Sequence, residues 1–175
     1  MESTIVLGGG CFWCTEAALQ RVPGVIEVIS GYSGGGHDTA TYEEVSTGAT
    51  DHAEVIKVAF EDSQVSTQKL LEIFFAIHDP TTLNQQGADK GSQYRSVIFY
   101  TSQEQKKIIE SYIKVLTENK VFKDPIVTEV REFKAFYPAE LYHQNFYNNN
   151  PKYGYCTVVI NPKLKKLNEV LSLNN

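Results

Sequence analysis

The sequence has little cysteine, a single methionine and no excess of positive charge. Its 175 residues include three cysteines, and the formal net charge is -5. A nucleic-acid partner or an anionic membrane surface requires a basic patch, so this charge balance argues against both. No apolar run is long enough to span a membrane, and the N-terminal MESTIVLGGG is too short and too polar for a signal peptide. We therefore expect a cytoplasmic protein with neither a nucleic acid nor a membrane as partner.

The odd number of cysteines, without a signal peptide, indicates a reducing compartment in which thiols remain available for chemistry. A chain of this length buries roughly 70% of its extended-chain surface on folding, so it needs no disulfide or metal to stabilise its core. We expect a single catalytic domain over 1–175.

Hydrophobic periodicity predicts alternating strands and helices. Strands are expected at 3–7, 25–32, 54–60, 96–101 and 126–130, and helices at 12–21, 70–77 and 103–120, with a terminal helix from Asn161 and Pro162 onward. This order is typical of α+β folds of the ferredoxin-like type, a split βαβ two-layer sandwich with helices over one mixed sheet. The core should occupy about 3–131, followed by an aromatic, turn-rich and loop-rich C-terminal extension, about 132–175, that carries Cys156.

The stretch GGGCFWCTE contains Cys11 and Cys14 and allows several interpretations. Cys11 would lie at the first turn of a helix, where free N–H groups and the helix dipole stabilise a thiolate. The alternative is a buried structural cysteine, which is common in protein cores. The triple glycine brings the backbone close to the sulfur, and bulky Phe12 and Trp13 follow at a polar turn. These neighbours favour a functional Cys11.

Two other uses of a C-x-x-C pair are disfavoured by the rest of the chain. A structural zinc site needs four ligands, but Cys156 stands alone and the four histidines are scattered. A glutaredoxin-like oxidoreductase also places C-x-x-C between a strand and a helix. That fold needs a cis-proline before a later strand, and no proline occurs between Pro23 and Pro80.

Further candidate residues lie where loops end. TYEEVSTGATDHAEV ends with Glu54 as a strand begins, and QGADKGSQYRS carries Asp89 and Tyr94. The connection 79–93 is long for a structureless segment, and such segments are usually functional. Taken singly, Glu54 also fits a solvated carboxylate and Tyr94 a core aromatic.

Five separated blocks together resemble the A-type peptide methionine sulfoxide reductases: GGGCFWC, GYSGG, TYEEVSTGATDHAEV, HDPTTLNQQGADKGSQYRSVIFY and YHQNFYNNNPKYGYC. The likeness extends in order from about Val6 to Cys156. It implies reduction of methionine-S-sulfoxide, free or in proteins, to methionine, and thus protein repair. It also implies no metal or organic cofactor and recycling by thioredoxin or a small dithiol. We expect the enzyme to act as a monomer.

The resemblance assigns roles to individual residues. Cys11 matches the nucleophile that attacks the sulfoxide sulfur and becomes a sulfenic acid, and Glu54 matches the acid that protonates the sulfoxide oxygen. The hydroxyls of Tyr42 and Tyr94 would hold that oxygen. The remaining matched residues form the substrate site: Phe12 and Trp13 as an apolar wall for the S-methyl group, and Asp89 lining the same site.

The resemblance leaves open which thiol reacts with the sulfenic acid on Cys11. Cys156, in a loop-rich tail free to swing, resembles a resolving cysteine, whereas many relatives have glycine at the position of Cys14. We therefore expect a first disulfide Cys11–Cys156, with Cys14 inert or passing the disulfide on. Two alternatives of other classes are a general dithiol oxidoreductase using Cys11 and Cys14, and a module that binds oxidised methionine without turnover.

Overall fold

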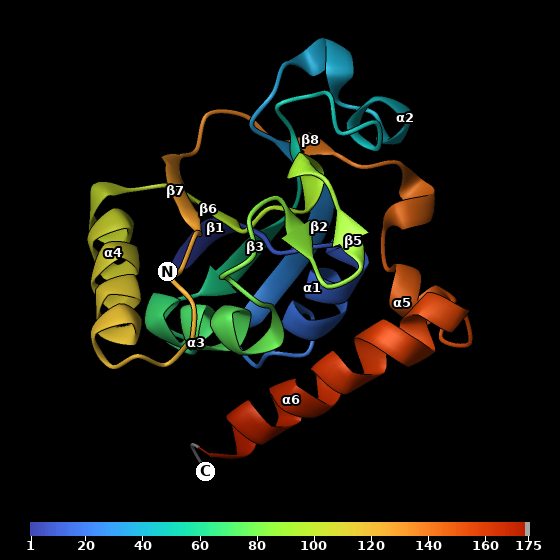
Figure 1. The fold of residues 1–175 in the computed structure, drawn as a ribbon. Helices are drawn as coiled ribbons and strands as arrows, with labels where there is room; N and C mark the ends of the chain where they lie inside the picture. The colour runs from blue at the N-terminus through green and yellow to red at the C-terminus, as the bar shows by residue number, and fades with distance from the viewer. Residues whose placement is uncertain (174–175) are drawn as a thin grey trace.

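A six-stranded sheet forms the centre of the molecule (Figure 1). The computed structural model describes residues 1–173. The strand order is β7-β6-β1-β3-β2-β8, and neighbouring strands are antiparallel except for the parallel pair β6 and β7. The strands are β1 (Glu2–Gly8), β2 (Val25–Ser33), β3 (Ala53–Glu61), β6 (Val97–Tyr100), β7 (Glu129–Glu132) and β8 (Tyr137–Pro138), and a separate hairpin pairs β4 (Gln85–Gln86) with β5 (Asp89–Lys90).

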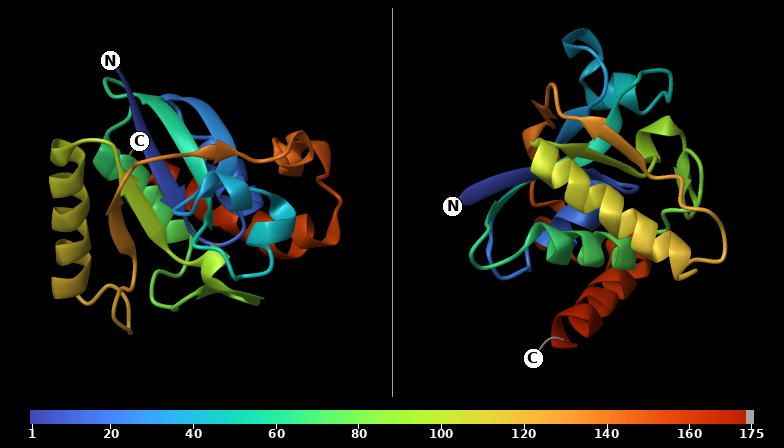
Figure 2. Two further views of the ribbon diagram at one scale, coloured as in Figure 1. Left: turned by 90° about the horizontal axis from the view of Figure 1, so that it is seen from above. Right: turned by 90° about the vertical axis from the view of Figure 1, so that its left-hand side faces the viewer.

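The longer helices begin at residues suited to cap them. Ser66 and Ser102 each accept a backbone N–H bond, at 3.0 and 3.1 Å, at the starts of α3 and α4. A proline in its first turn starts α6, which lies below α3 in the right-hand view of Figure 2. The helices are α1 (Phe12–Leu19), α2 (Tyr42–Val45), α3 (Thr67–Ile77), α4 (Gln103–Glu118), α5 (Phe146–Asn149) and α6 (Asn161–Ser172).

Alternation along β3 divides the core between the two faces of the sheet. Ile56, Val58 and Phe60 are buried in the main cluster, together with residues of α1, α3, α4 and α6. Val55 belongs to a smaller cluster on the opposite face, which Phe133 and Phe136 cover. Because side chains alternate along a strand, Glu54 shares the face of Ile56 and points toward the helices. The alternation therefore places a carboxyl on the helical side of the sheet.

The predicted strands and helices are confirmed, with their ends shifted by a few residues. The strand expected at 126–130 forms at β7 instead, because the N–H of Val127 bonds to the Pro80 carbonyl, at 2.8 Å, and not to β6. The long connection 79–93 contains the β4–β5 hairpin and a 3₁₀ turn at Ser92–Tyr94. The coarse prediction of a mixed fold with helices on a central, mostly antiparallel sheet is confirmed.

The C-terminal extension is fastened to this core by two side chains, the buried Glu16 and the half-buried Gln144. The Glu16 carboxyl of α1 accepts bonds from the Ser30 hydroxyl, at 3.1 Å, and the Phe146 N–H, at 3.3 Å. The Gln144 amide bonds to both the N–H and the C=O of Ser30, at 3.0 and 2.8 Å, as a neighbouring strand would. The extension is turn-rich as far as Gly154, but one π-helical turn, Cys156–Ile160, then leads into α6. The expectation of a loop around Cys156 that is free to swing is therefore wrong.

Candidate active site

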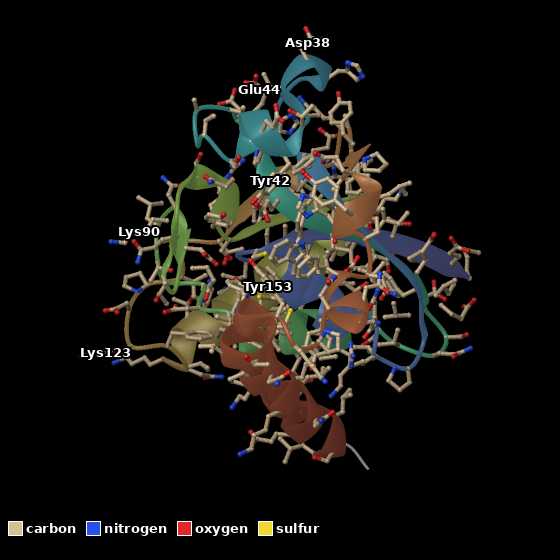
Figure 3. The ribbon with its side chains drawn as sticks, turned by 90° about the vertical axis from the view of Figure 1, so that its right-hand side faces the viewer. Asp38, Tyr42, Glu44, Lys90, Lys123 and Tyr153 are labelled. Atoms are coloured by element: carbon tan, nitrogen blue, oxygen red, sulfur yellow. The ribbon has the colours of Figure 1, made fainter. Side chains whose placement is uncertain are left out.

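A cavity of about 220 Å³ lies where β1 ends and β3 begins. Seven of the nine residues predicted for the site line this cavity. In Figure 3, which faces the cavity side, Tyr42 and Tyr153 lie near the centre and Lys90 of β5 lies at the edge. Within residues 1–173, the predicted residues Cys14 and Cys156 lie outside the lining. The full lining is Cys11, Phe12, Trp13, Tyr42, Glu54, Asp89, Tyr94, Tyr153 and Tyr155.

Cys11 is the N-cap residue of α1 and is partly exposed to the cavity. Gly10 precedes it with a φ of +88°, a conformation that glycine adopts without steric cost. Burial, a side-chain hydrogen bond with Cys14 and the nearby Glu54 raise the pKa of the Cys11 thiol, although the N–H of Trp13 acts in the opposite direction. The helix N-terminus alone therefore does not make Cys11 a thiolate, contrary to the expectation from the sequence.

Glu54 supplies a buried carboxyl beside this thiol. Glu54 is only 2% exposed, and one of its carboxyl oxygens accepts a hydrogen bond from the N–H of Phe12 at 3.2 Å. Burial raises the pKa of Glu54 to about 8, against the opposing effect of that hydrogen bond. A carboxyl with this pKa is mostly protonated at neutral pH, so Glu54 is available as a proton donor.

The two predicted tyrosines also reach the cavity in their neutral form. Burial and the proximity of Glu54 raise the pKa values of Tyr42 and Tyr94, so both hydroxyls keep the proton that they can donate. The N–H of Tyr42 bonds to the Glu140 carboxylate at 3.0 Å, which fixes the start of α2. Two hydroxyl donors and one carboxylic acid thus converge on a small volume.

Arg95 fixes the loop that carries Tyr94. Its guanidinium donates to the carbonyl oxygens of Ser92, at 3.0 Å, and Asp51, at 2.9 Å, and it forms an ion pair with Glu129 at 3.1 Å. Arg95 is only 8% exposed, so these bonds satisfy a buried charge. The bonds join the loop to the segment before β3 and thereby bring Tyr94 to the same cavity as Glu54.

Aromatic rings hold Trp13 in the cavity wall. Its indole stacks on Phe146, with ring centroids 3.7 Å apart and planes 5° apart, and Tyr153 and Tyr155 meet it edge-on. The indole N–H donates to Nδ1 of the buried His143 at 3.1 Å. The wall is therefore apolar toward the cavity and rigid behind it.

A chain of hydrogen bonds runs from the buried Cys14 through Tyr155 to Asp89, and the last two residues line the cavity. The Tyr155 hydroxyl donates to the Asp89 carboxylate at 2.7 Å and contacts the Cys14 sulfur at 3.5 Å. The bond with Cys11, the charge of Lys163 and the bond with Tyr155 lower the pKa of Cys14 to about 7. Asp89 therefore lies at the cavity, where the sequence predicts it, and its carboxylate also orients the Tyr155 hydroxyl.

All three cysteines are free thiols, and two of them share a buried cluster. Cys14 and Cys156 are 1% and 0% exposed and pack with Ala17 and Ile160, and Cys11 borders the same cluster. Among residues 1–173, no group of three or more His, Cys, Asp or Glu side chains is arranged to hold a metal ion. In the same part of the chain, no helix has the length and apolar character needed to cross a membrane.

Sequence reasoning missed three residues of this site: Tyr153, Tyr155 and His143. All three belong to the block YHQNFYNNNPKYGYC, whose aromatic content was the available signal. The block has no helical or strand periodicity, so nothing in it indicated which rings would face the cavity.

A thiol at a helix N-terminus, a neutral buried acid and an aromatic wall define the site of a thiol-dependent oxidoreductase. The chain belongs to the A-type peptide methionine sulfoxide reductases, because the family model described as peptide methionine sulfoxide reductase matches residues 3–174. The predicted family and enzyme class are thereby confirmed.

Curated relatives agree over nearly the whole chain. Peptide methionine sulfoxide reductase MsrA of Trichodesmium erythraeum is 54% identical over 95% of this chain and 94% of its own length. The MsrA of Sulfolobus acidocaldarius is 58% identical over 91% of this chain and 90% of its own length.

Solved structures agree in fold. Mxr1 from Saccharomyces cerevisiae in reduced form matches with a TM-score of 0.83 and 34% identity over 89% of each chain. Mxr1 in complex with Trx2 matches with a TM-score of 0.59 and 25% identity, over 83% of this chain and 84% of that chain.

Proposed function

We propose that the protein reduces methionine-S-sulfoxide, free or within proteins, to methionine and so repairs oxidised proteins. The observation that carries this proposal is the placement of the Cys11 thiol and the neutral Glu54 carboxyl on one cavity of about 220 Å³. The family membership supports the same reaction.

The roles of Cys11 and Glu54 follow from the chemistry of the sulfoxide group. Its oxygen is a poor leaving group, so the sulfur becomes electrophilic as that oxygen gains a proton. Glu54 gives the proton while the Cys11 sulfur attacks the sulfoxide sulfur. The oxygen ends on Cys11 as a sulfenic acid, and methionine leaves as the thioether. The proton that the Cys11 thiol loses on attack restores the Glu54 acid, so the step consumes no net proton.

The remaining cavity residues bind and orient the substrate. The hydroxyls of Tyr42 and Tyr94 hold the sulfoxide oxygen, and Phe12 and Trp13 receive the S-methyl group. Asp89 lines the same cavity. A small apolar slot with a few placed polar groups suits a substrate that is a dipole next to a methyl group.

A second thiol, Cys14 or Cys156, converts the sulfenic acid to a disulfide, and thioredoxin or a small dithiol reduces it. The Mxr1–Trx2 complex supports thioredoxin as the partner. Under this proposal the enzyme needs no metal or organic cofactor.

The finer architectural predictions are part of the same proposal. A ferredoxin-like description of the core is supported by the antiparallel order β6-β1-β3-β2, in which β3 lies between β1 and β2. A single catalytic domain over 1–175 is supported by the common core of α1, α3, α4 and α6. A cytoplasmic enzyme is consistent with three free thiols. Under the same proposal the enzyme acts as a monomer.

The test is a single-turnover assay with a methionine-S-sulfoxide peptide and no reductant. Wild type should release methionine, and Cys11→Ser should release none. Methionine release by Cys11→Ser at near-normal rate would overturn the assignment of the nucleophile. Peptide binding without methionine release by wild type would indicate a binding module, and disulfide reduction without sulfoxide turnover would indicate a general dithiol oxidoreductase.

A further inference from the structure

We propose that Cys14 is the first thiol to react with oxidised Cys11, and that Cys156 then takes the disulfide over from Cys14. This proposal rests on the function proposed above, because it concerns the fate of the sulfenic acid on Cys11. It reverses the order expected from the sequence, in which Cys156 is the first thiol to react with Cys11.

Cys11 and Cys14 are already in contact in the reduced protein. The N–H of Cys14 bonds to the Cys11 carbonyl at 3.0 Å, which closes the first turn of α1. The Cys11 side chain also packs against the buried cluster that contains the Cys14 side chain. The backbone of Cys11 is extended, with φ of -62° and ψ of 129°, so its side chain is not held in the direction that a helical residue would give it. An i, i+3 pair of this kind meets the Cα separation that a disulfide requires.

Cys14 is placed to meet Cys11 but not the substrate. It lies outside the cavity lining and is 1% exposed, whereas Cys11 lies in the lining. A sulfoxide in the cavity therefore contacts the sulfur of Cys11 alone. Cys14 is buried in the cluster that Cys11 borders, so it acts only in the step after methionine is released.

Cys156 is placed to meet Cys14. The two side chains pack in one buried cluster with Ala17 and Ile160. Burial raises the pKa of Cys156, and the charge of the nearby Cys14 raises it further. Cys156 opens the π-helical turn that leads into α6, and it is a member of the buried cluster with Cys14, whereas Cys11 only borders this cluster. A transfer through Cys14 requires only contact between neighbours.

The surroundings of Cys14 also favour its ionised form. The side-chain bond with Cys11 is the largest cause that lowers the pKa of Cys14, and the charge of Lys163 and the Tyr155 hydroxyl, which contacts the Cys14 sulfur at 3.5 Å, lower it further. Lys163 and Tyr155 are still beside Cys14 after Cys11 is oxidised, so they continue to favour the thiolate, which is the attacking species.

The steps balance without a further oxidant. The Cys14 sulfur attacks the sulfenic sulfur of Cys11, an S–S bond forms, and the S–O bond breaks with hydroxide leaving as water after it takes up a proton. The Cys156 sulfur then attacks Cys14, which returns Cys11 to the thiolate and leaves a Cys14–Cys156 disulfide. A dithiol of the thioredoxin class reduces this disulfide and is itself oxidised.

The test follows the oxidation state of the Cys11 sulfur after one turnover in two variants, Cys14→Ser and Cys156→Ser. Both variants replace a thiol by a hydroxyl within the same buried cluster. Each variant is mixed with excess methionine-S-sulfoxide peptide without reductant, and methionine, sulfenic acid trapped by dimedone and mapped disulfides are followed in time. Release of one methionine per enzyme by both variants shows that each retains a working site. If Cys14→Ser fails to fold, two other experiments show which thiol reacts first with Cys11. These are the same assay on Cys14→Ala and mapping of the first disulfide that forms in wild type.

We expect Cys156→Ser to form Cys11–Cys14 at the wild-type rate without trapped sulfenic acid. Cys14→Ser should keep its sulfenic acid roughly tenfold longer or more, because a thiol held in contact reacts far faster than one that must move into place. Wild type should release two methionines and end with Cys14–Cys156. Formation of Cys11–Cys156 at the wild-type rate in Cys14→Ser, or trapped sulfenic acid in Cys156→Ser, would overturn the proposal. Absence of methionine release from all three proteins would instead overturn the proposed function.

Discussion

The N–H of Phe12 donates a hydrogen bond to the carboxyl of Glu54 at 3.2 Å and joins the first turn of α1 to the start of β3. A helix N-terminus favours an ionised carboxylate, and burial disfavours it. Burial has the larger effect here, since the pKa of Glu54 is raised to about 8. The bond therefore holds a neutral acid in place beside Cys11, where proton donation is needed.

Replacing Glu54 with glutamine should slow the chemical step while retaining the shape of the cavity. Glutamine can still accept the Phe12 N–H bond, but an amide has no proton to give to a sulfoxide oxygen. General acid catalysis contributes about 10²–10⁴-fold, so single-turnover methionine release should fall by that range. Glu54→Asp should lose less because it keeps an acid. A glutamine variant with more than about half the wild-type rate would assign proton delivery to another group.

Glu54→Gln should also gain stability relative to wild type as the pH rises toward 8. The pKa of Glu54 rises from 4.5 when unfolded to about 8 when folded, so between these values the folded protein binds more protons than the unfolded chain. The stability contribution of Glu54 is therefore complete below pH 4.5 and is lost as pH rises through 8, at a cost of up to about 5 kcal/mol.

Urea unfolding of wild type and Glu54→Gln at pH 5 and pH 8 measures this contribution. The difference in free energy of unfolding between the two proteins should shift in favour of Glu54→Gln on going from pH 5 to pH 8. Glu16, whose pKa burial also raises, is present in both proteins and cancels in the comparison. A difference that stays constant between the two pH values would show that Glu54 ionises normally.

Local sequence patterns predicted the strands, the long helices and the position of Glu54. Alternation along β3 and helical spacing along α3 depend on residues close in the sequence, so they are visible without a structure. The GGGCFWC turn likewise indicated a cysteine at a helix N-terminus. Only the family resemblance predicts that four separated residues meet in one cavity: Tyr42, Glu54, Asp89 and Tyr94. The strand order that brings their loops together is not a local property of the sequence.

The C-terminal extension shows why the remaining features were not predictable. Its fastening depends on single side chains, Glu16 and Gln144, that bond to backbone far away in the sequence. No periodicity marks such contacts. The sequence therefore predicts only a loop-rich segment and does not indicate that Cys156 is buried against Cys14.

Gly10→Ala should destabilise the protein and displace Cys11. The φ of Gly10 is +88°, and a Cβ there would lie 2.7 Å from Cγ of Gln86. Strained backbone of this kind costs about 1–3 kcal/mol, and the Gln86 amide cannot retreat freely because it bonds to the N–H and C=O of Asp79. Chemical denaturation should show this loss, and methionine release should slow as well. Gly36→Ala is the control, since nothing lies within 4 Å of its added Cβ.

Phe146→Ala should weaken substrate use through Trp13. The two rings stack with centroids 3.7 Å apart, and the Glu16 carboxyl holds the Phe146 backbone beneath the indole. An aromatic pair contributes about 0.5–1.5 kcal/mol, so kcat/KM should fall by about two- to tenfold, mainly through KM, as the wall for the S-methyl group loosens.

Tyr147→Ala is the matched control for that change. It removes a ring from the same short helix, α5, but this ring packs on Arg21 and bonds to Asn161 instead of contacting the indole. Its kcat/KM should stay near that of wild type. Equal losses in both variants would show that Phe146 acts through the stability of the C-terminal extension and not through Trp13. A loss confined to Phe146→Ala, together with a changed Trp13 fluorescence, would establish that the stack positions the cavity wall.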